Sequence, residues 1–467
     1  MNQCTERDDG SMTKDMTKGN PLLLILGFCI PMVFGNVLQQ FYNLADTAIV
    51  GKCLNSDALA AIGLTGAVCF LVIGFATGLC TGLSIPVAQA YGAGDMKLMR
   101  RYMVNAAYIA TAACVVLTAL TLVFCRPLLR LMDTPADILD MSASYLYVIF
   151  AGLAATILYN LLAGFLRAMG DSTTPLIFLA VSSVLNIGLD FLMILVFHLG
   201  VMGAGLATVL AQGISAVCCL YYMYRHFPVL TFERDEFPLH MPFVGKLCGI
   251  GLPMAFQFSI TAIGSIILQT AINGFGPDII ASVSTAQKIQ NVVGGPMESM
   301  GITMATYCGQ NLGAGRIDRI RQGLRSSIFT TLIYAVLAYL FSAFLGQYFV
   351  YLFLSKDDPA FGTVLEYAMQ YLRISGLFYP VLAVLFVLRN SLQGMGYSFL
   401  PMSAGIVELA ARAFAVGVLI RAYGFTGVCL ASPTAWVAAD VLLISATVWA
   451  MCTLHKRVPN GAAQSIS

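Results

Sequence analysis

The sequence has little charge for its length. Only 10% of its 467 residues are Asp, Glu, Lys or Arg, whereas soluble domains contain about 25%. A chain with so few charges cannot cover a water-exposed surface, which excludes a cytosolic enzyme and a disordered scaffold. The formal net charge is only +2, so no basic surface for DNA or RNA is expected. With a mean hydropathy of +0.82, the composition predicts a polytopic membrane protein.

Motifs for metal binding and catalysis are lacking as well. The four histidines lie at or beyond the ends of apolar runs, and no two of the thirteen cysteines form C-x-x-C. The cysteines are therefore read as small buried apolar residues. The sequence contains no H-E-x-x-H, no G-x-S-x-G and no G-x-x-x-x-G-K-S/T phosphate loop. We expect no enzyme activity and no cofactor, and any transport must use an ion gradient.

Long apolar runs dominate what is present. A helix needs about 20 apolar residues to cross a bilayer, and uncharged runs of this length include 102–125 and 326–355. Breaks at Gly, Pro and charged clusters divide the chain into twelve spans, which predicts an all-α membrane protein. The expected spans are 20–47, 57–83, 99–125, 138–164, 174–197, 203–224, 243–273, 279–305, 322–348, 363–389, 398–420 and 425–452.

The distribution of Lys and Arg orients these spans. If the N-terminus is inside, the cytoplasmic segments hold sixteen of these residues and the outer loops hold five. Positive residues favour the cytoplasmic side, so both termini are predicted to be cytoplasmic. No short apolar segment with a small-residue cleavage site precedes residue 20, so no removable signal peptide is expected.

The second half of the chain repeats the first. GFCIPMVFGN (27–36) aligns with GIGLPMAFQF (249–258) at an offset of 222, and RAMGDSTTP (167–175) aligns with QGMGYSFLP (393–401) at an offset of 226. Two further matches, at 221 and 224, follow the same order. Since each half has an even number of spans, the repeats are parallel, as in many secondary transporters. The predicted parts are a tail (1–19), an N-lobe (20–224), a solvated linker (225–242), a C-lobe (243–452) and a second tail (453–467).

Polar residues form a stripe in three helices of the N-lobe. Asp46, Asn186, Asp190 and Thr208 all lie within apolar spans, where charged and amide groups usually face a cavity or a partner. Two carboxylates with amide and hydroxyl oxygens suit a hard monovalent cation such as Na⁺. If brought close, the carboxylates could instead share a proton. Either arrangement would make a coupling-ion site; the alternative is that these groups only bind neighbouring helices.

The C-lobe differs in its chemistry. Its first helix has a polar face of amides and hydroxyls but no acid, because Leu268 stands opposite Asp46 in the repeat. An ion site is therefore expected in the N-lobe. Glu408 lies four residues before Arg412, so an intrahelical ion pair is the simple explanation of both.

The substrate path is predicted from polar, soft and acidic side chains within the spans. Polyspecific cavities use Met and aromatic residues that can repack, although such residues more often form the core. Pro31 and Pro253 occupy matching positions in the two lobes and are predicted hinges, or else static kinks. The candidates for the path are Gln39, Gln40, Asn43, Gln257, Gln269, Asn273, Met254, Phe256, Glu298, Glu408 and Asp440.

Several motifs resemble one known family. NLADTAIVG (43–51), QAYGAGD (89–95), RAMGDSTTP (167–175), NIGLD (186–190) and QNLGAG (310–315) occur in the order found in multidrug and toxin extrusion (MATE) proteins of prokaryotes. The resemblance covers residues 19–452. It implies two six-helix bundles around a central cleft, and export of mostly cationic, amphipathic small molecules against Na⁺ or H⁺.

The resemblance also implies roles for particular residues. It assigns Asp46, Asn186, Asp190 and Thr208 to the coupling ion, with Tyr145 as the nearby tyrosine. A glutamate that another branch of the family places in the seventh helix is absent here. The resemblance suggests a monomer in the inner (plasma) membrane of a bacterium. A flippase of lipid-linked precursors from the same superfamily is the alternative, disfavoured because five acids and four bases share the spans.

Overall fold

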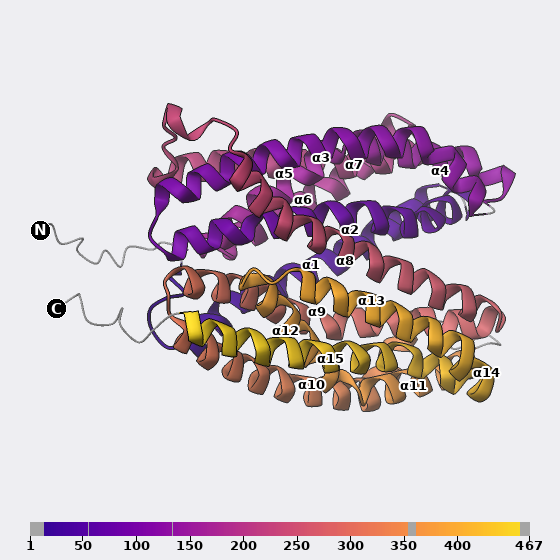
Figure 1. Ribbon diagram of the computed structural model, residues 1–467. Helices are drawn as coiled ribbons and strands as arrows, with labels where there is room; N and C mark the ends of the chain where they lie inside the picture. Colours follow the sequence, from indigo (N-terminus) through magenta and orange to yellow (C-terminus); the bar gives the residue numbers. More distant parts are fainter. Residues whose placement is uncertain (1–13, 55, 133, 354–360, 458–467) are drawn as a thin grey trace, which may run out of the picture.

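The computed structural model describes residues 14–54, 56–132, 134–353 and 361–457, and long helices make up most of them. Two bundles lie side by side, which confirms the predicted fold class (Figure 1). The first contains α1 (Pro21–Cys53), α2 (Ser56–Gly92), α3 (Met96–Leu131), α4 (Ala136–Ala151), α5 (Leu153–Ala168), α6 (Thr173–Phe191) and α7 (Val201–His226). The second contains α8 (Met241–Asn273), α9 (Pro277–Gly313), α10 (Ile317–Phe353), α11 (Phe361–Gly376), α12 (Tyr379–Gly394), α13 (Phe399–Phe414), α14 (Ile420–Tyr423) and α15 (Phe425–Arg457).

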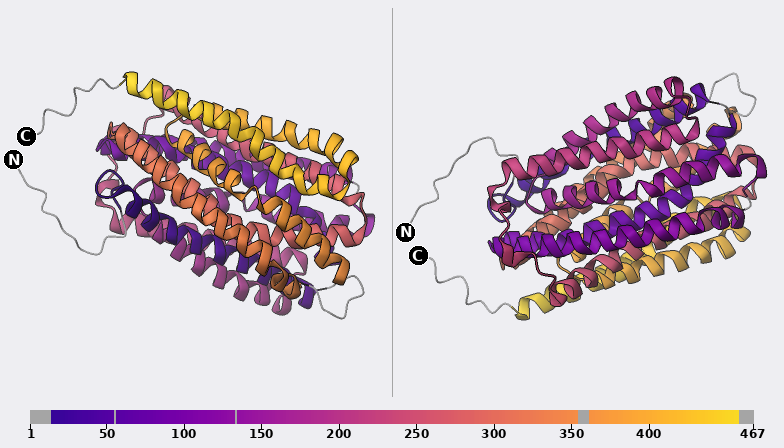
Figure 2. Two further views of the ribbon diagram at one scale, coloured as in Figure 1. Left: turned by 90° about the horizontal axis from the view of Figure 1, so that it is seen from below. Right: turned by 90° about the horizontal axis from the view of Figure 1, so that it is seen from above.

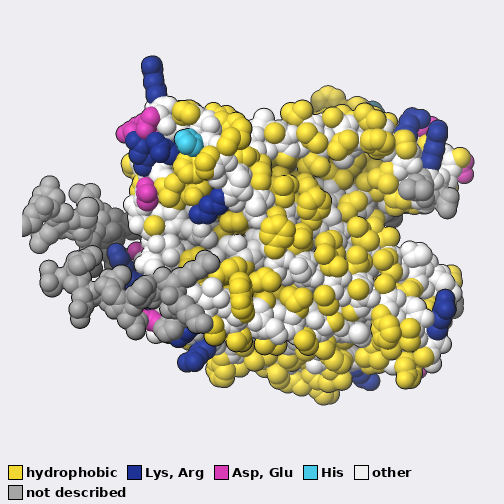
Figure 3. All heavy atoms as spheres, viewed as in Figure 1, with side chains coloured by type: hydrophobic (Ala, Val, Ile, Leu, Met, Phe, Trp, Pro, Cys, Tyr) yellow, Lys and Arg dark blue, Asp and Glu magenta, His cyan; other side chains and the backbone are white. Residues whose placement is uncertain are grey.

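These helices account for twelve membrane spans. In the described part of the chain, nine helices are long and apolar enough to cross a bilayer. The pairs α4–α5 and α11–α12, bent by 46° and 53°, each form one more. Helix α9 is the remaining span; it has 37 residues and is less apolar because its amides face a cavity between the lobes. On the visible face, apolar side chains cover the length of the molecule and most charges gather at its two ends (Figure 3), as a bilayer requires.

The backbone reproduces the sequence repeat. Gly94 and Gly315 have φ values of 74° and 70°, and Gly200 and Gly424 have values of 59° and 56°. These pairs are the ones that the repeat aligns, and the left-handed region is open to glycine because it lacks a Cβ. A π-helical turn also recurs, at Leu192–Val196 in the first half and at Ala415–Leu419 in the second. The two lobes therefore share their turns as well as their helix order.

Helices α1 and α8 cross between the lobes. Phe28 of α1 is buried in the C-lobe core, whereas Val50, further along the same helix, packs in the N-lobe. Helix α8 does the reverse, with Leu247 in the N-lobe core and Ile272 in the C-lobe core. Each of these two helices therefore contributes to the cores of both lobes. Each crossing helix contains its proline, Pro31 in α1 and Pro253 in α8.

Residues 14–19, which we call the latch, join the lobes at one end of the molecule. Lys14 N–H donates to Gly170 O of the N-lobe (2.9 Å), and Met16 N–H donates to Gln310 Oε1 of the C-lobe (3.0 Å). Gln310 in turn donates to Ala168 O (2.8 Å). The Met16 side chain is fully buried. The predicted N-terminal tail is therefore partly built into the fold, at the end where α1 begins and α15 finishes (Figure 2).

The linker 225–242 is mostly exposed, and two of its acidic residues anchor it to α3. Glu236 is buried and its carboxylate accepts from the Arg100 guanidinium of α3, with Nε–Oε2 and Nη2–Oε1 distances of 2.8 and 2.6 Å. Asp235 also pairs with Lys97 (2.7 Å). The Arg100 guanidinium holds the pKa of Glu236 below its usual range.

This ion pair predicts a pH dependence of stability. The pKa of Glu236 is lower in the folded chain than in the unfolded chain. The ion pair therefore stabilises the fold fully above the unfolded pKa of about 4.3, and this stabilisation is lost as the pH falls through the folded pKa. We expect Glu236→Gln to lower the midpoint of thermal unfolding at neutral pH. The midpoint of the variant should also fall less than that of wild type when the pH is lowered. Midpoints measured from neutral to acidic pH test this, with the exposed Glu366→Gln as control. Equal acid sensitivity of wild type and E236Q would contradict it.

Candidate functional site

The N-lobe cluster is built by three helices. Helix α1 supplies Asp46, α6 supplies Asn186 and Asp190, and α7 supplies Thr208. Asp190 and Asn186 are 0% and 1% exposed. The carboxyl groups of Asp46 and Asp190 lie within hydrogen-bonding reach of each other. The structure thus brings together all four residues that the sequence predicted for the ion.

Amide and hydroxyl groups complete this cluster. With its amide turned to suit both neighbours, Asn186 donates to Asp190 Oδ2 (2.9 Å) and accepts from Thr208 N–H (3.0 Å). The Thr208 hydroxyl donates to Ala204 O (3.1 Å). One buried oxygen each of Asp46 and Asp190 has no hydrogen-bond partner. Buried polar atoms usually have a hydrogen-bond partner. The free oxygen of Asp46 and that of Asp190 are therefore available to an ion.

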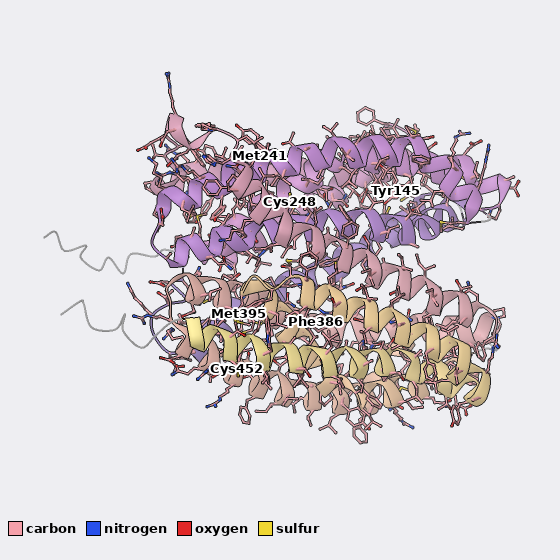
Figure 4. The ribbon with its side chains drawn as sticks, viewed as in Figure 1. Tyr145, Met241, Cys248, Phe386, Met395 and Cys452 are labelled. Carbon is pink, nitrogen blue, oxygen red and sulfur yellow. The ribbon has the colours of Figure 1, made fainter. Side chains whose placement is uncertain are left out.

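Two tyrosines border the cluster. The Tyr42 hydroxyl lies 3.4 Å from Thr208 Oγ1; its place one turn before Asp46 on the polar face of α1 was the signal in the sequence. Tyr145 packs with residues beside the cluster, including Ile49 and Ala204. It lies in the N-lobe towards the end opposite the chain termini (Figure 4). Tyr145 therefore lies near the cluster, as the resemblance implied. Tyr42 is a second tyrosine beside the cluster, which the resemblance did not assign.

A separate cavity of about 1610 Å³ lies between the lobes. Figure 3 shows the surface hollowed between the lobes at the end opposite the latch. Phe256 does not line the cavity; it is 50% exposed and packs edge-on against Phe75. Asp440 is buried outside the cavity wall, and the Asn43 side chain falls outside the described residues. The predicted path residues that do line it are Gln39, Gln40, Gln257, Gln269, Asn273, Met254, Glu298 and Glu408.

A buried charge cluster forms part of the cavity wall. Arg412 Nη2 binds Glu408 Oε1 and Arg389 Nη2 binds Glu408 Oε2, both at 2.6 Å. The intrahelical pair expected from the sequence is therefore present, with a second arginine added from α12. Arg389 lies 19 positions away in the sequence, so helical spacing could not reveal it. Both Glu408 oxygens are engaged, which leaves Glu298 as the other acid on the wall.

The architecture defines the class of protein: a two-lobed, twelve-span membrane transporter with a central cavity. The family profile named MatE matches residues 31–192 and 253–417. The chain belongs to this family, the multidrug and toxin extrusion transporters. It is therefore a MATE-family multidrug efflux transporter, which confirms the resemblance seen in the sequence.

Individual relatives agree with this placement. The chain is 30% identical over 383 residues to the probable multidrug resistance protein YpnP of Bacillus subtilis, covering 82% of this chain and 84% of that protein. It is 25% identical over 438 residues, 90% of each chain, to the probable multidrug resistance protein NorM of Thermotoga maritima. A solved outward-facing MATE transporter of the MOP superfamily superposes with a TM-score of 0.86 at 21% identity, covering 97% of this chain and 100% of that one.

Proposed function

We propose that the protein is an antiporter that exports organic cations, drugs or toxic metabolites from the cytoplasm in exchange for Na⁺ or H⁺. The contact between Asp46 and Asp190 carries this proposal. Two acids brought together within a membrane, one of them fully buried and the other half-buried, are costly unless a cation or a proton is bound. They lie outside the wall of the cavity, so ion and substrate bind in different places and must be coupled through helix movement.

Helix α1 is the natural connection between the two places. It supplies Asp46 to the cluster, and its residues Asn36, Gln39 and Gln40 line the cavity. Asn36 Nδ2 also donates to Ser299 Oγ of α9 (2.9 Å). A change in ion occupancy at Asp46 would therefore act on cavity residues of the same helix, with Pro31 as the hinge.

Alternating access requires that one end of the cavity be closed while the other is open. The latch and Gln310 close one end by joining the lobes, and the hollow in Figure 3 lies at the opposite end. If the positive residues face inwards, the latch end is cytoplasmic and the cavity opens outwards. We place the protein in a bacterial plasma membrane, as a monomer with both termini in the cytoplasm.

We expect Met16→Asp to weaken the closed end. Met16 is fully buried, and an unpaired carboxylate at this position is unfavourable. Hydrogen exchange measured by mass spectrometry should show faster exchange in residues 310–319 than in wild type. Lys18→Ala, at an exposed latch position, should leave exchange unchanged. Unchanged exchange in M16D would show that the latch does not hold this end of the cavity closed.

The experiment that tests the proposed function is export of a fluorescent cation from proteoliposomes under separately imposed Na⁺ and pH gradients. We expect uphill export of ethidium under one of the two gradients, and this result identifies the coupling ion. No export under either gradient would contradict the proposal and favour the lipid-linked precursor flippase. The mixed charges on the cavity wall argue against that alternative.

A further inference from the structure

The linker 225–242 projects sideways from the N-lobe. In Figure 1 it rises beyond α3 and α7, beside the ends of these helices and on the side of the molecule where both chain termini lie. Charged side chains gather at the same level, next to the apolar flank (Figure 3). The headgroups of a bilayer that covers this flank lie at that level. The linker is therefore placed over the membrane surface at the latch end.

The second half of the linker is docked on a helix that faces lipid. The Tyr108 hydroxyl of α3 donates to Phe237 O (3.1 Å), and His240 N–H donates to Asn105 Oδ1 of α3 (3.0 Å). Asn105 and Tyr108 lie roughly 14–18 Å along α3 from its start at Met96, at a rise of about 1.5 Å per residue. Most of the apolar part of α3 is not buried inside the protein. The linker thus reaches down to the boundary between headgroups and acyl chains.

This part of the linker exposes large apolar side chains. Phe232 and Phe237 are 38% and 48% exposed, and their ring centres lie 6.0 Å apart. Leu239 and Met241 are 51% and 69% exposed, and Met241 lies where the linker joins α8 (Figure 4). Aromatic residues are enriched where a protein meets the membrane surface. Lipid would cover a face that is otherwise left in water.

The acidic residues of this corner are all engaged with α3. Asp95 caps the helix by accepting from Leu98 N–H (2.9 Å). The acids of the linker hold it on α3 through ion pairs with N–O distances of 2.6–3.5 Å: Glu233 and Asp235 with Lys97, Asp235 with Arg101, and Glu236 with Arg100.

Three basic side chains remain without an acid. Arg225, Arg234 and Lys246 are exposed, and within the described ranges none of them forms an ion pair. Lys246 of α8 instead lies over the ring of Tyr102, 5.1 Å from its centre, which holds the ammonium group beside α3. Basic groups at a membrane surface attract anionic lipids, by about fivefold for each Lys or Arg. The excess positive charge therefore complements an anionic bilayer.

We propose that the linker and the start of α8 bind the headgroups of anionic phospholipids through Arg225, Arg234 and Lys246. The rings of Phe232 and Phe237 insert between the lipids beside them. This inference is independent of the substrate and of the coupling ion. Because the linker joins α7 to α8, and α8 crosses between the lobes, bound lipid would hold the chain at the point where the two lobes are connected.

Lipid retention tests the inference. The full-length protein is reconstituted into vesicles with equal amounts of dioleoylphosphatidylglycerol and dioleoylphosphatidylcholine, which have the same acyl chains and differ in charge. The protein is then extracted in mild detergent, and mass spectrometry measures the lipids that remain bound. Wild type should retain phosphatidylglycerol over phosphatidylcholine by at least about fivefold.

Variants assign the preference to the three residues. The triple variant R225Q/R234Q/K246Q should retain both lipids in nearly equal amounts. The matched control is R126Q/R130Q/R421Q, which removes the same charge from exposed positions at the opposite end of the molecule and should keep the preference. The midpoint of thermal unfolding in detergent shows whether each variant is folded. If the first triple variant is not, each of its single substitutions should still lose part of the preference.

Hydrogen exchange tests the position of the linker directly. In wild type, residues 228–242 should exchange more slowly in vesicles of phosphatidylglycerol than in vesicles of phosphatidylcholine, and in R225Q/R234Q/K246Q the two rates should be equal. Three results would overturn the inference: a lipid preference that survives in this variant, an equal loss in the control, or wild-type exchange that is the same in both lipids. The last result would leave the apolar face to a soluble protein partner.

Discussion

Asp190→Asn is expected to abolish ion-driven export while leaving substrate binding in the cavity intact. Asp190 is fully buried, in contact with Asp46 and held by Asn186. An amide keeps the shape of this side chain but can neither release a proton nor neutralise a cation. Because the cluster lies outside the cavity wall, the variant should bind dye as wild type does. Asp46→Asn should have the same effect.

The measurement is the initial rate of dye export from proteoliposomes under the gradient that drives wild type. We expect D190N and D46N to lose at least about tenfold in rate, the effect of 1.4 kcal/mol or more on the transport barrier. Asp140→Asn is the matched control, since Asp140 is an exposed acid paired with Arg126. Wild-type export by D190N would show that the N-lobe acids are structural and would move attention to Glu298.

Glu408→Ala is expected to be the most destabilising substitution in the C-lobe. Glu408 is the shared partner of Arg389 and Arg412, and all three side chains are at most 8% exposed. Removing one member of a buried ion pair leaves uncompensated charge and costs about 3–5 kcal/mol. Here two arginines lose their partner at once, and Arg389 Nε and Arg412 Nη1 already lack one.

Chemical denaturation in detergent measures this effect as a shift of the midpoint. Replacing all three residues by Met should recover most of the stability, because apolar groups of similar volume can replace a buried ion pair at little cost. A midpoint of E408A equal to that of wild type would show that Glu408 is not needed to compensate the charges of Arg389 and Arg412. If the triple variant were less stable than E408A, the charges would have to stabilise the fold in their own right.

The N-lobe cluster could be predicted because its signals are local. Asn186 and Asp190 are four residues apart, so helical geometry alone puts them on one face. Acidic residues in an apolar helix also indicate a partner or a cavity. The repeat was visible for the same reason, and the aligned glycines Gly94 and Gly315 share a positive φ because equivalent turns need the same backbone.

What the sequence could not reveal depends on contacts between distant segments. Arg389 joins Glu408 from another helix, and Met16 reaches Gln310 across 294 positions. Nothing in either segment alone indicates the other. Phe256 was misplaced for a related reason. Helix α8 meets both lobes and the surface, and its sequence alone does not show which of these an aromatic side chain contacts.

We propose that Asp46 and Asp190 together hold the ion that is exchanged for substrate. The most direct test of this proposal is ion release from the purified protein when ethidium is added, followed with a pH indicator for H⁺ and with radioactive sodium for Na⁺. We expect wild type to release one of the two ions, whereas D46N and D190N, which still bind ethidium, should release neither. Release of the same ion by both variants, to the extent seen in wild type, would contradict it.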